Sequence, residues 1–231
     1  MKKMLSVLFI GVGLLTLAAC GNNDENAASD NNQNSVAAND NLTEKFGKSL
    51  VVYFSQPETT DPNNLTTEEE NSAIVVDDEV LGNVQYVGMQ IQDQTEADIF
   101  RIEPETPYTT DHDALTEFAS EEQSNNARPT LKESVENLDE YDTIFFGYPN
   151  WWGDMPMIMY SFLEEHDLAG KTVIPFNVHG GSGLSDTVNS ITEEAPDATI
   201  VTDALTISRD DVDGSEGDVT DWLNNLPETN N

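Results

Sequence analysis

Five short, continuous apolar stretches punctuate the chain, and such runs are typical of strands buried on both faces of a sheet. They cover residues 49–54, 97–102, 143–147, 172–176 and 199–205. Between and after them, apolar residues recur at helical spacing, which predicts helices. These helices cover residues 84–94, 113–123, 157–165, 184–194 and 214–226. The alternation of strands with helices predicts an α/β fold with a parallel sheet covered on both faces.

The predicted topology brings three loops together. Right-handed crossovers place the carboxyl ends of parallel strands at one edge of the sheet, where ligands of such folds bind. The loop after the first strand begins Ser55-Gln56-Pro57, and the loop after the third contains Trp151 and Trp152. The loop after the fourth strand is rich in glycine. Aromatic faces and open backbone amides suit a flat aromatic ring that carries an anionic tail.

The first 45 residues have a different composition from the rest of the 231-residue chain. Lys2 and Lys3 precede an apolar run that ends in Leu17-Ala18-Ala19-Cys20, and this arrangement predicts an export signal over residues 1–20. The segment resembles the bacterial lipobox, which implies lipidation of Cys20, the only cysteine, and a membrane-anchored location outside the cytoplasm. Residues 21–45 are predominantly polar and predict a disordered tether, followed by one domain over residues 46–227.

Charge excludes one class of function. The chain has 9 basic and 44 acidic residues and a net charge of −35. Phosphate contacts dominate nucleic-acid binding and need basic side chains, so a nucleic acid is not an expected partner. The histidines lack the spacing of metal ligands, so no metal site is predicted. Ser182 lacks the Gly-x-Ser-x-Gly context of a hydrolase nucleophile, and no catalytic residue is assigned.

Three motifs together resemble the flavodoxin-like proteins. They are Tyr53-Phe54-Ser55, the segment Gly147-Tyr148-Pro149-Asn150-Trp151-Trp152-Gly153, and Gly180-Gly181-Ser182-Gly183. The resemblance covers residues 50–226 and is closest to the flavodoxin branch whose second loop is Gly-Tyr-Pro-x-Trp-Trp-Gly. It implies an open five-stranded parallel sheet with helices on both faces and a bound FMN. Tyr148 and Trp151 are the residues expected to stack on or flank the FMN ring, and His179 is a candidate hydrogen-bond or proton donor to it.

The first loop departs from the family pattern. Ser55 is followed by a polar stretch, and the Gly-Asn of the family appears only at Gly82-Asn83, where Val84 replaces the usual threonine. We therefore predict an insertion over about residues 56–81 that splits the phosphate loop and contains a hairpin turning at Asp77-Asp78. The resemblance then implies that these residues bind FMN: Ser55, Gln56, Thr59, Gly82, Asn83, Val84, Gln85, Tyr148, Pro149, Asn150, Trp151, Trp152, Gly153, Val178, His179, Gly180, Gly181, Ser182 and Gly183.

The resemblance leaves several functions open. The first expectation is an electron-transfer flavoprotein with an unidentified redox partner. The alternatives are an NAD(P)H-linked quinone or nitro-compound reductase and a cofactor-free binding lipoprotein on the same scaffold, because a fold does not determine a function. A further alternative is an interaction module that uses the acidic segment around Glu68-Glu69-Glu70.

Overall fold

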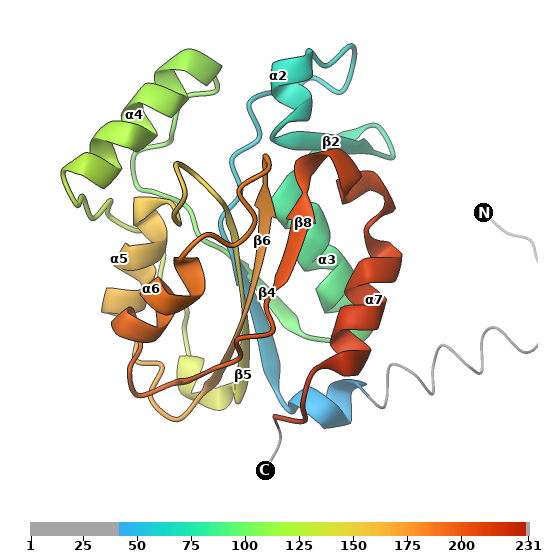
Figure 1. Cartoon of the computed structure of the whole chain (residues 1–231), viewed down its shortest axis with the longest axis vertical. Coiled ribbons are helices and arrows are strands. Elements are labelled where there is room, and N and C mark those ends of the chain that lie inside the picture. The colour runs from blue at the N-terminus through green and yellow to red at the C-terminus, as the bar shows by residue number, and fades with distance from the viewer. Residues whose placement is uncertain (1–41, 230–231) are drawn as a thin grey trace, which may run out of the picture.

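A twisted parallel sheet forms the centre of the protein. The computed structural model describes residues 42–229, and its main sheet has the strand order β4-β1-β5-β6-β7, with β8 also paired to β6 (Figure 1). The α/β architecture predicted from the sequence is confirmed, since every pairing in this sheet is parallel. The strands are β1 Ser49–Tyr53, β4 Asp98–Arg101, β5 Thr143–Pro149, β6 Thr172–His179, β7 Thr199–Ile200 and β8 Leu205–Ser208.

Helices cover both faces of the sheet. In Figure 1, α3 and α7 lie on one side, α5 and α6 lie on the other, and α4 extends past the end of the strands at which β6 terminates. The α-helices are α3 Asn83–Thr95, α4 His112–Ser124, α5 Met157–Glu165, α6 Thr187–Glu194 and α7 Glu216–Asn225. Two short 3₁₀ helices, η1 Leu138–Glu140 and η2 Arg209–Gly214, complete this part of the chain.

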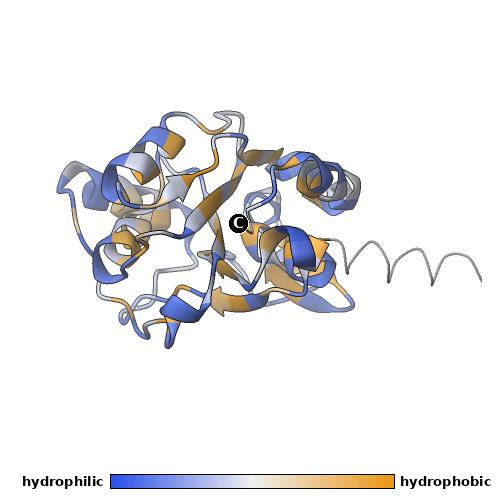
Figure 2. Ribbon diagram, turned by 90° about the horizontal axis from the view of Figure 1, so that it is seen from below, coloured by the Kyte–Doolittle hydropathy of each residue, from blue (hydrophilic) through white to orange (hydrophobic). Residues whose placement is uncertain are grey.

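The central strands divide the core into two hydrophobic clusters. Successive side chains of a strand point to opposite faces of the sheet. In β1, Leu50 and Val52 therefore pack toward α5 and α6, while Val51 and Tyr53 pack toward α3 and α7. Figure 2 shows the strands at the centre coloured largely as hydrophobic, with hydrophilic residues outside. This double burial explains why the strands are continuous apolar runs in the sequence.

The fifth predicted strand, over residues 199–205, is divided in the structure. Residues 202–204 leave the sheet, so β7 and β8 pair with β6 at separate places, Thr172↔Thr199 and Phe176↔Leu205. The polar Thr202-Asp203 pair lies in this break, and the Asp203 carbonyl accepts a 2.8 Å hydrogen bond from Trp222 Nε1. The sheet consequently has six strands.

The segment between β1 and α3 folds as a small unit beside the sheet. It contains α2 Thr67–Glu70 and an antiparallel hairpin of β2 Ala73–Val76 and β3 Glu79–Gly82. Asp77 and Asp78 have φ of 50° and 64°, which are the positive values that a type I′ turn requires. The predicted hairpin is thus present, and its turn is the predicted pair.

The N-terminal boundary of the domain differs from the sequence prediction. Residues 42–46 are helical, and Leu42 and Phe46 are buried. Phe46 packs edge-on against Phe145 at a ring-centroid distance of 5.2 Å. The end of the predicted tether, residues 42–45, therefore forms part of the domain. The predicted signal peptide, Cys20 and tether residues 21–41 lie outside the described residues. No helix within residues 42–229 combines the length and apolarity needed to cross a membrane.

Candidate functional site

The three predicted loops meet around one cavity at the carboxyl edge of the sheet. The cavity encloses about 220 Å³, somewhat less than the roughly 300–1,000 Å³ of typical small-molecule sites. Among the predicted site residues, those lining it are Ser55, Gln56, Asn83, Val84, Pro149, Asn150, Trp151, Trp152, Val178, His179 and Gly180. Eight residues that the sequence analysis missed also line it: Glu58, Asn71, Ser72, His112, Leu115, Thr116, Ala119 and Arg209.

A tight turn presents the two tryptophans differently. Trp151 and Asp154 exchange backbone hydrogen bonds of 2.9 and 3.0 Å across Trp152 and Gly153, whose φ values are 53° and 82°. Positive φ at both central residues makes this a type I′ turn. Trp152 is 62% exposed, and its Nε1 donates a 3.0 Å hydrogen bond to the Thr116 carbonyl of α4. A bulky side chain held in the left-handed region is rare and concentrates at functional sites.

Trp151 is anchored more deeply. Its ring packs edge-on against Phe54 and Tyr108, with centroid distances of 5.5 and 5.8 Å. Such T-shaped pairs are favourable because the positive edge of one ring meets the negative face of another. Trp151 therefore joins the cavity wall to the core.

Tyr148 does not take the place expected for a ring-stacking residue. Its side chain is fully buried, and its hydroxyl donates a 2.7 Å hydrogen bond to Thr187 Oγ1 of α6. Burial raises the pKa of this phenol above its usual value. Because Tyr148 belongs to β5, the alternation of the strand turns its ring into the core beside Phe146, away from the cavity.

The loop after β6 supports the cavity mainly through its backbone. Asn150 Nδ2 donates a 2.9 Å hydrogen bond to the Gly183 carbonyl, which joins this loop to the tryptophan turn. His179 Nδ1 accepts a 2.8 Å hydrogen bond from the Gly181 amide, so that nitrogen carries no proton. The remaining predicted members of these loops, Gly153, Gly181, Ser182 and Gly183, support the cavity without lining it.

The split first loop is rejoined in space. A Cβ atom on Gly82 would lie 2.1 Å from Ser55 Oγ, so the two ends of the insertion touch and only glycine fits between them. The Asn83 amide, at the start of α3, donates a 3.0 Å hydrogen bond to the Ser72 carbonyl of the insertion. Asn83 Nδ2 donates another, of 3.1 Å, to the Asn71 carbonyl. The insertion thus occupies one amide of the predicted phosphate loop and adds its own polar groups.

Three predicted residues of this loop lie away from the cavity. Thr59 and Gln85 line a separate groove between the insertion and the segment that follows β4. Gln85 Oε1 accepts a 3.3 Å hydrogen bond from the Gly82 amide, and Thr59 Oγ1 accepts one of 3.2 Å from Asp61. Gly82 supports the loop by its packing on Ser55.

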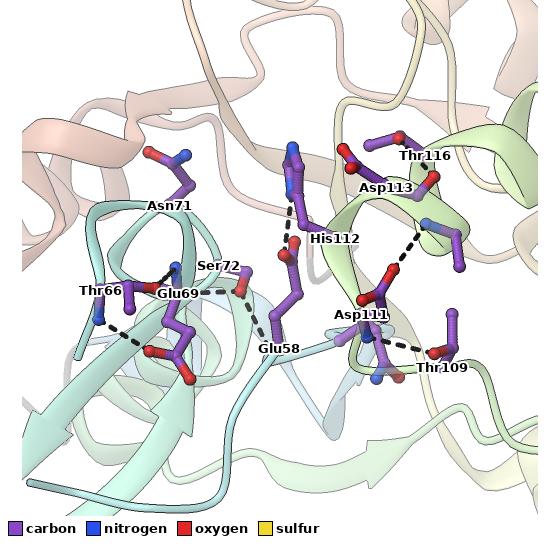
Figure 3. A network of polar contacts seen from close by, with 12 residues as sticks. Glu58, Thr66, Glu69, Asn71, Ser72, Thr109, Asp111, His112, Asp113 and Thr116 are labelled. Carbon is purple, nitrogen blue, oxygen red and sulfur yellow. Dashed lines mark hydrogen bonds and ion pairs between the residues drawn. The ribbon is translucent and has the colours of Figure 1, made fainter.

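A side-chain hydrogen bond joins the insertion to α4 across the cavity wall. His112 Nδ1 lies 2.8 Å from Glu58 Oε2, and the side chain of Glu58 is only 8% exposed (Figure 3). The Glu58 amide donates a 3.0 Å hydrogen bond to Ser72 Oγ, and Asp111 caps α4 through the Ala114 amide. The pairing offsets the cost of burying the Glu58 carboxylate.

One face of α4 forms the remaining wall. His112, Leu115, Thr116 and Ala119 all line the cavity, and the spacing i, i+3, i+4, i+7 places them on one side of the helix. This spacing was the sequence signal that could have revealed the wall. A helix face that packs into a hydrophobic core has the same spacing, however. Within the described part of the chain, no group of three or more His, Cys, Asp or Glu side chains is arranged to hold a metal ion.

A parallel sheet covered by helices on both faces, with a cavity at its carboxyl edge, is the doubly wound α/β class of protein, in which ligands bind at that edge. The chain belongs to the flavodoxin family: the sequence profile described as Flavodoxin matches residues 73–226, two-thirds of its length. Among proteins with curated descriptions, none matches it significantly.

Solved structures share the fold. A protein from Bacteroides eggerthii, provisionally described as a flavoprotein, is 27% identical with a TM-score of 0.58, and the match covers 77% of this chain and 96% of that one. A similarly described protein from Bacteroides uniformis is 27% identical with a TM-score of 0.60, covering 78% and 99%. A flavoprotein from Lactobacillus acidophilus, crystallised with FMN, is 16% identical with a TM-score of 0.52 over 72% and 97%, which is a likeness of fold alone.

Proposed function

We propose that this protein binds FMN in the cavity and acts in electron transfer. The observation that carries the proposal is the meeting of the tryptophan turn, the glycine-rich loop and the start of α3 around one cavity. The descriptions of the two Bacteroides proteins as flavoproteins, and of the Lactobacillus protein as an FMN complex, support it. When bound, FMN would supply the redox chemistry, while the protein would position it and tune its potential.

The residues present fit such a group. Trp151 and Trp152 offer indole surface at one side of the cavity, and polar side chains at Ser55, Asn71 and Asn83 lie at the other. Beside Gly180, the guanidinium group of Arg209 fills the space that a side chain would take, since a Cβ there would come 2.9 Å from Arg209 Nη1. The enclosed volume is small for a whole flavin nucleotide, so part of the ligand would lie in the open mouth beside the exposed Trp152.

The experiment that tests the proposal is an absorption spectrum of the whole chain purified without added cofactor, followed by titration with FMN. Binding would give flavin absorption bands or quench the flavin fluorescence on addition, because stacked indoles quench it. A folded, colourless protein that leaves FMN fluorescence unchanged at high micromolar concentration would refute the proposal.

A cofactor-free binding protein on the same scaffold is the second candidate. The specific observation in its favour is the hydrogen bond from the Asn83 amide to Ser72, which takes up a group that the phosphate loop would otherwise offer. The same spectrum separates the two candidates, since only the first predicts a flavin chromophore or a response to FMN.

We further propose that the protein acts outside the cytoplasmic membrane, anchored through a lipid on Cys20. The support is the sequence pattern before Cys20, with its basic start, apolar run and small residues. Incorporation of labelled palmitate into the wild type but not into a Cys20→Ser variant is the expected result. Equal labelling of both, or labelling of neither, would contradict the anchor.

A further inference from the structure

Arg209 places a positive charge in a site whose ligand is proposed to be an anion. It is the first residue of η2, immediately after β8, and it lines the cavity. A Cβ atom on Gly180 would lie 2.9 Å from its Nη1 atom and 3.2 Å from its Cζ atom. The guanidinium group is therefore packed against the backbone of the glycine-rich loop, in the space that a side chain at position 180 would take.

Arg209 forms no strong ion pair with the residues that the structure describes. Among the described residues, its ion pair is with Asp210 Oδ1 at 4.0 Å, and the Asp210 side chain is 84% exposed. Solvent-exposed ion pairs at such distances contribute little to stability. Among the described residues that line the cavity, Arg209 is the only lysine or arginine. The chain has only nine basic residues and a net charge of −35. A basic residue in the cavity wall is therefore unusual.

The surroundings of Arg209 are suited to an anion. The one carboxylate in the cavity lining, Glu58, is hydrogen-bonded with His112 Nδ1 at 2.8 Å and lies on the side of the insertion and α4 (Figure 3). The start of α3, where the helix dipole attracts anions, lines the same cavity through Asn83 and Val84, although the Asn83 backbone amide is bonded to Ser72. The 3₁₀ helix η2 leads directly to Ser215, whose Oγ donates a 3.1 Å hydrogen bond to Gln90 of α3.

We infer that Arg209 binds the phosphate of the ligand and makes the cavity selective for FMN over riboflavin. This inference rests on the proposed function and extends it to a specificity-determining residue. Val84 offers no hydroxyl to a phosphate, and Asn83 has its amide engaged by Ser72. A guanidinium group compensates for both, since it binds phosphate oxygens through two parallel hydrogen bonds.

The test compares FMN with riboflavin, which differ only in the phosphate. The two ligands are titrated by fluorescence into the wild type, Arg209→Gln, Arg209→Lys and the control Lys48→Gln. Lys48 lies before β1, at the opposite edge of the sheet, in an exposed pair with Glu140. We expect Arg209→Gln to weaken FMN about tenfold or more, because a charge-assisted hydrogen bond is lost, and to leave riboflavin unchanged. Arg209→Lys should keep part of the preference for FMN, and Lys48→Gln should keep all of it.

The outcomes separate this inference from the proposed function. If the wild type binds FMN and Arg209→Gln binds it equally well, the inference fails and the proposed function stands. An equal loss of FMN and riboflavin in both Arg209 variants would assign the residue to the ring or to folding, and would also overturn the inference. If the folded wild type binds neither ligand, both fail together. A preference of the wild type for FMN that shrinks with added salt would support the phosphate contact.

Discussion

The two sides of the cavity are built in different ways. The aromatic side comes from one contiguous turn, in which Trp151 and Trp152 are neighbours in sequence. The polar side is assembled from the end of β1, the insertion, the start of α3 and the start of η2. The first is a local structure that one motif encodes, whereas the second exists only once distant segments have packed together.

This difference affects how each side is held. The aromatic turn closes on itself through the paired backbone hydrogen bonds of Trp151 and Asp154. The polar side depends on contacts that span the insertion, namely Ser55 against Gly82 and Glu58 with His112. A single change on the polar side can therefore be expected to separate several elements. On the aromatic side, the effect depends on whether the change removes the core contacts of Trp151 or the exposed ring of Trp152.

The largest expected effect is the loss of stability when Trp151 is replaced, which is compared with the same replacement of Trp152. Trp151→Ala should destabilise the fold by about 2–4 kcal/mol, a little below the range for a full core site because the ring is only partly buried. Trp152→Ala should change the stability by no more than about 0.5 kcal/mol, since the side chain is largely exposed. Urea unfolding measures both, and both variants should bind FMN more weakly.

The pair of variants contains its own control. Trp152 contributes little to the core, so a loss of FMN affinity in Trp152→Ala without loss of stability would locate the ligand at the turn. Unchanged FMN affinity in both variants would show that the aromatic side is a hydrophobic lid. Equal destabilisation by the two changes would contradict the division between an anchored and an exposed indole.

A second prediction concerns the polar side. Gly82→Ala should destabilise the protein by about 1–3 kcal/mol, the usual cost of overpacking, because the new Cβ would meet Ser55. The φ of Gly82 is −72°, so alanine adds no backbone strain and the effect is steric. The control is Gly217→Ala in α7, where a Cβ meets nothing within 4 Å and alanine should stabilise the helix slightly.

Chemical denaturation and FMN titration together distinguish the outcomes of Gly82→Ala. A less stable variant with weakened FMN binding would mean that the insertion and the first loop must touch to form the site. If Gly82→Ala is as stable as the wild type, the contact is loose and the polar side is not a single packed unit.

Local patterns predicted most of the fold. The bounds of α5 agree with the predicted helix over residues 157–165, since a strongly apolar helix has a clear period. The Asp77-Asp78 turn was predictable because few residue pairs tolerate two positive φ values. The break between β7 and β8 was not, because a pattern of apolar residues does not show where a strand leaves its partner.

The candidate site was predicted where a sequence motif marks it, including Ser55 and Asn83 in the two halves of the split first loop. The turn containing Trp151 and the loop containing His179 were both found as motifs, and they line the cavity. Tyr148 was misplaced because its strand position, rather than its neighbours in the motif, decides which way its ring points. Glu58 and His112 are 54 residues apart, and Arg209 follows the last strand, so only tertiary packing shows that they share one cavity.

The smallest expected effect lies behind the aromatic side. Tyr108 packs on Trp151, and its hydroxyl donates a 2.9 Å hydrogen bond to Glu122 of α4. Burial raises the pKa of the Glu122 carboxyl above 4.5, and the hydrogen bond from Tyr108 only partly opposes this. Between the ordinary pKa and the higher folded pKa, the folded state therefore holds a proton that the unfolded state releases. The stability contribution of this group is full below about pH 4.5 and falls as the pH rises toward the higher folded pKa.

Glu122→Gln should remove this loss of stability at higher pH, since a glutamine can accept the same hydrogen bond from Tyr108 without ionising. We expect the variant to be slightly more stable than the wild type at pH 7 and to show no such gain at pH 4, as measured by urea unfolding at both values. The exposed neighbour Glu121→Gln is the matched control and should give no pH-dependent difference. A Glu122→Gln variant less stable than the wild type at pH 7 would mean that Tyr108 needs a charged acceptor. The ring network behind Trp151 would then depend on an ionic contact, and the aromatic side would not be as self-contained as its turn indicates.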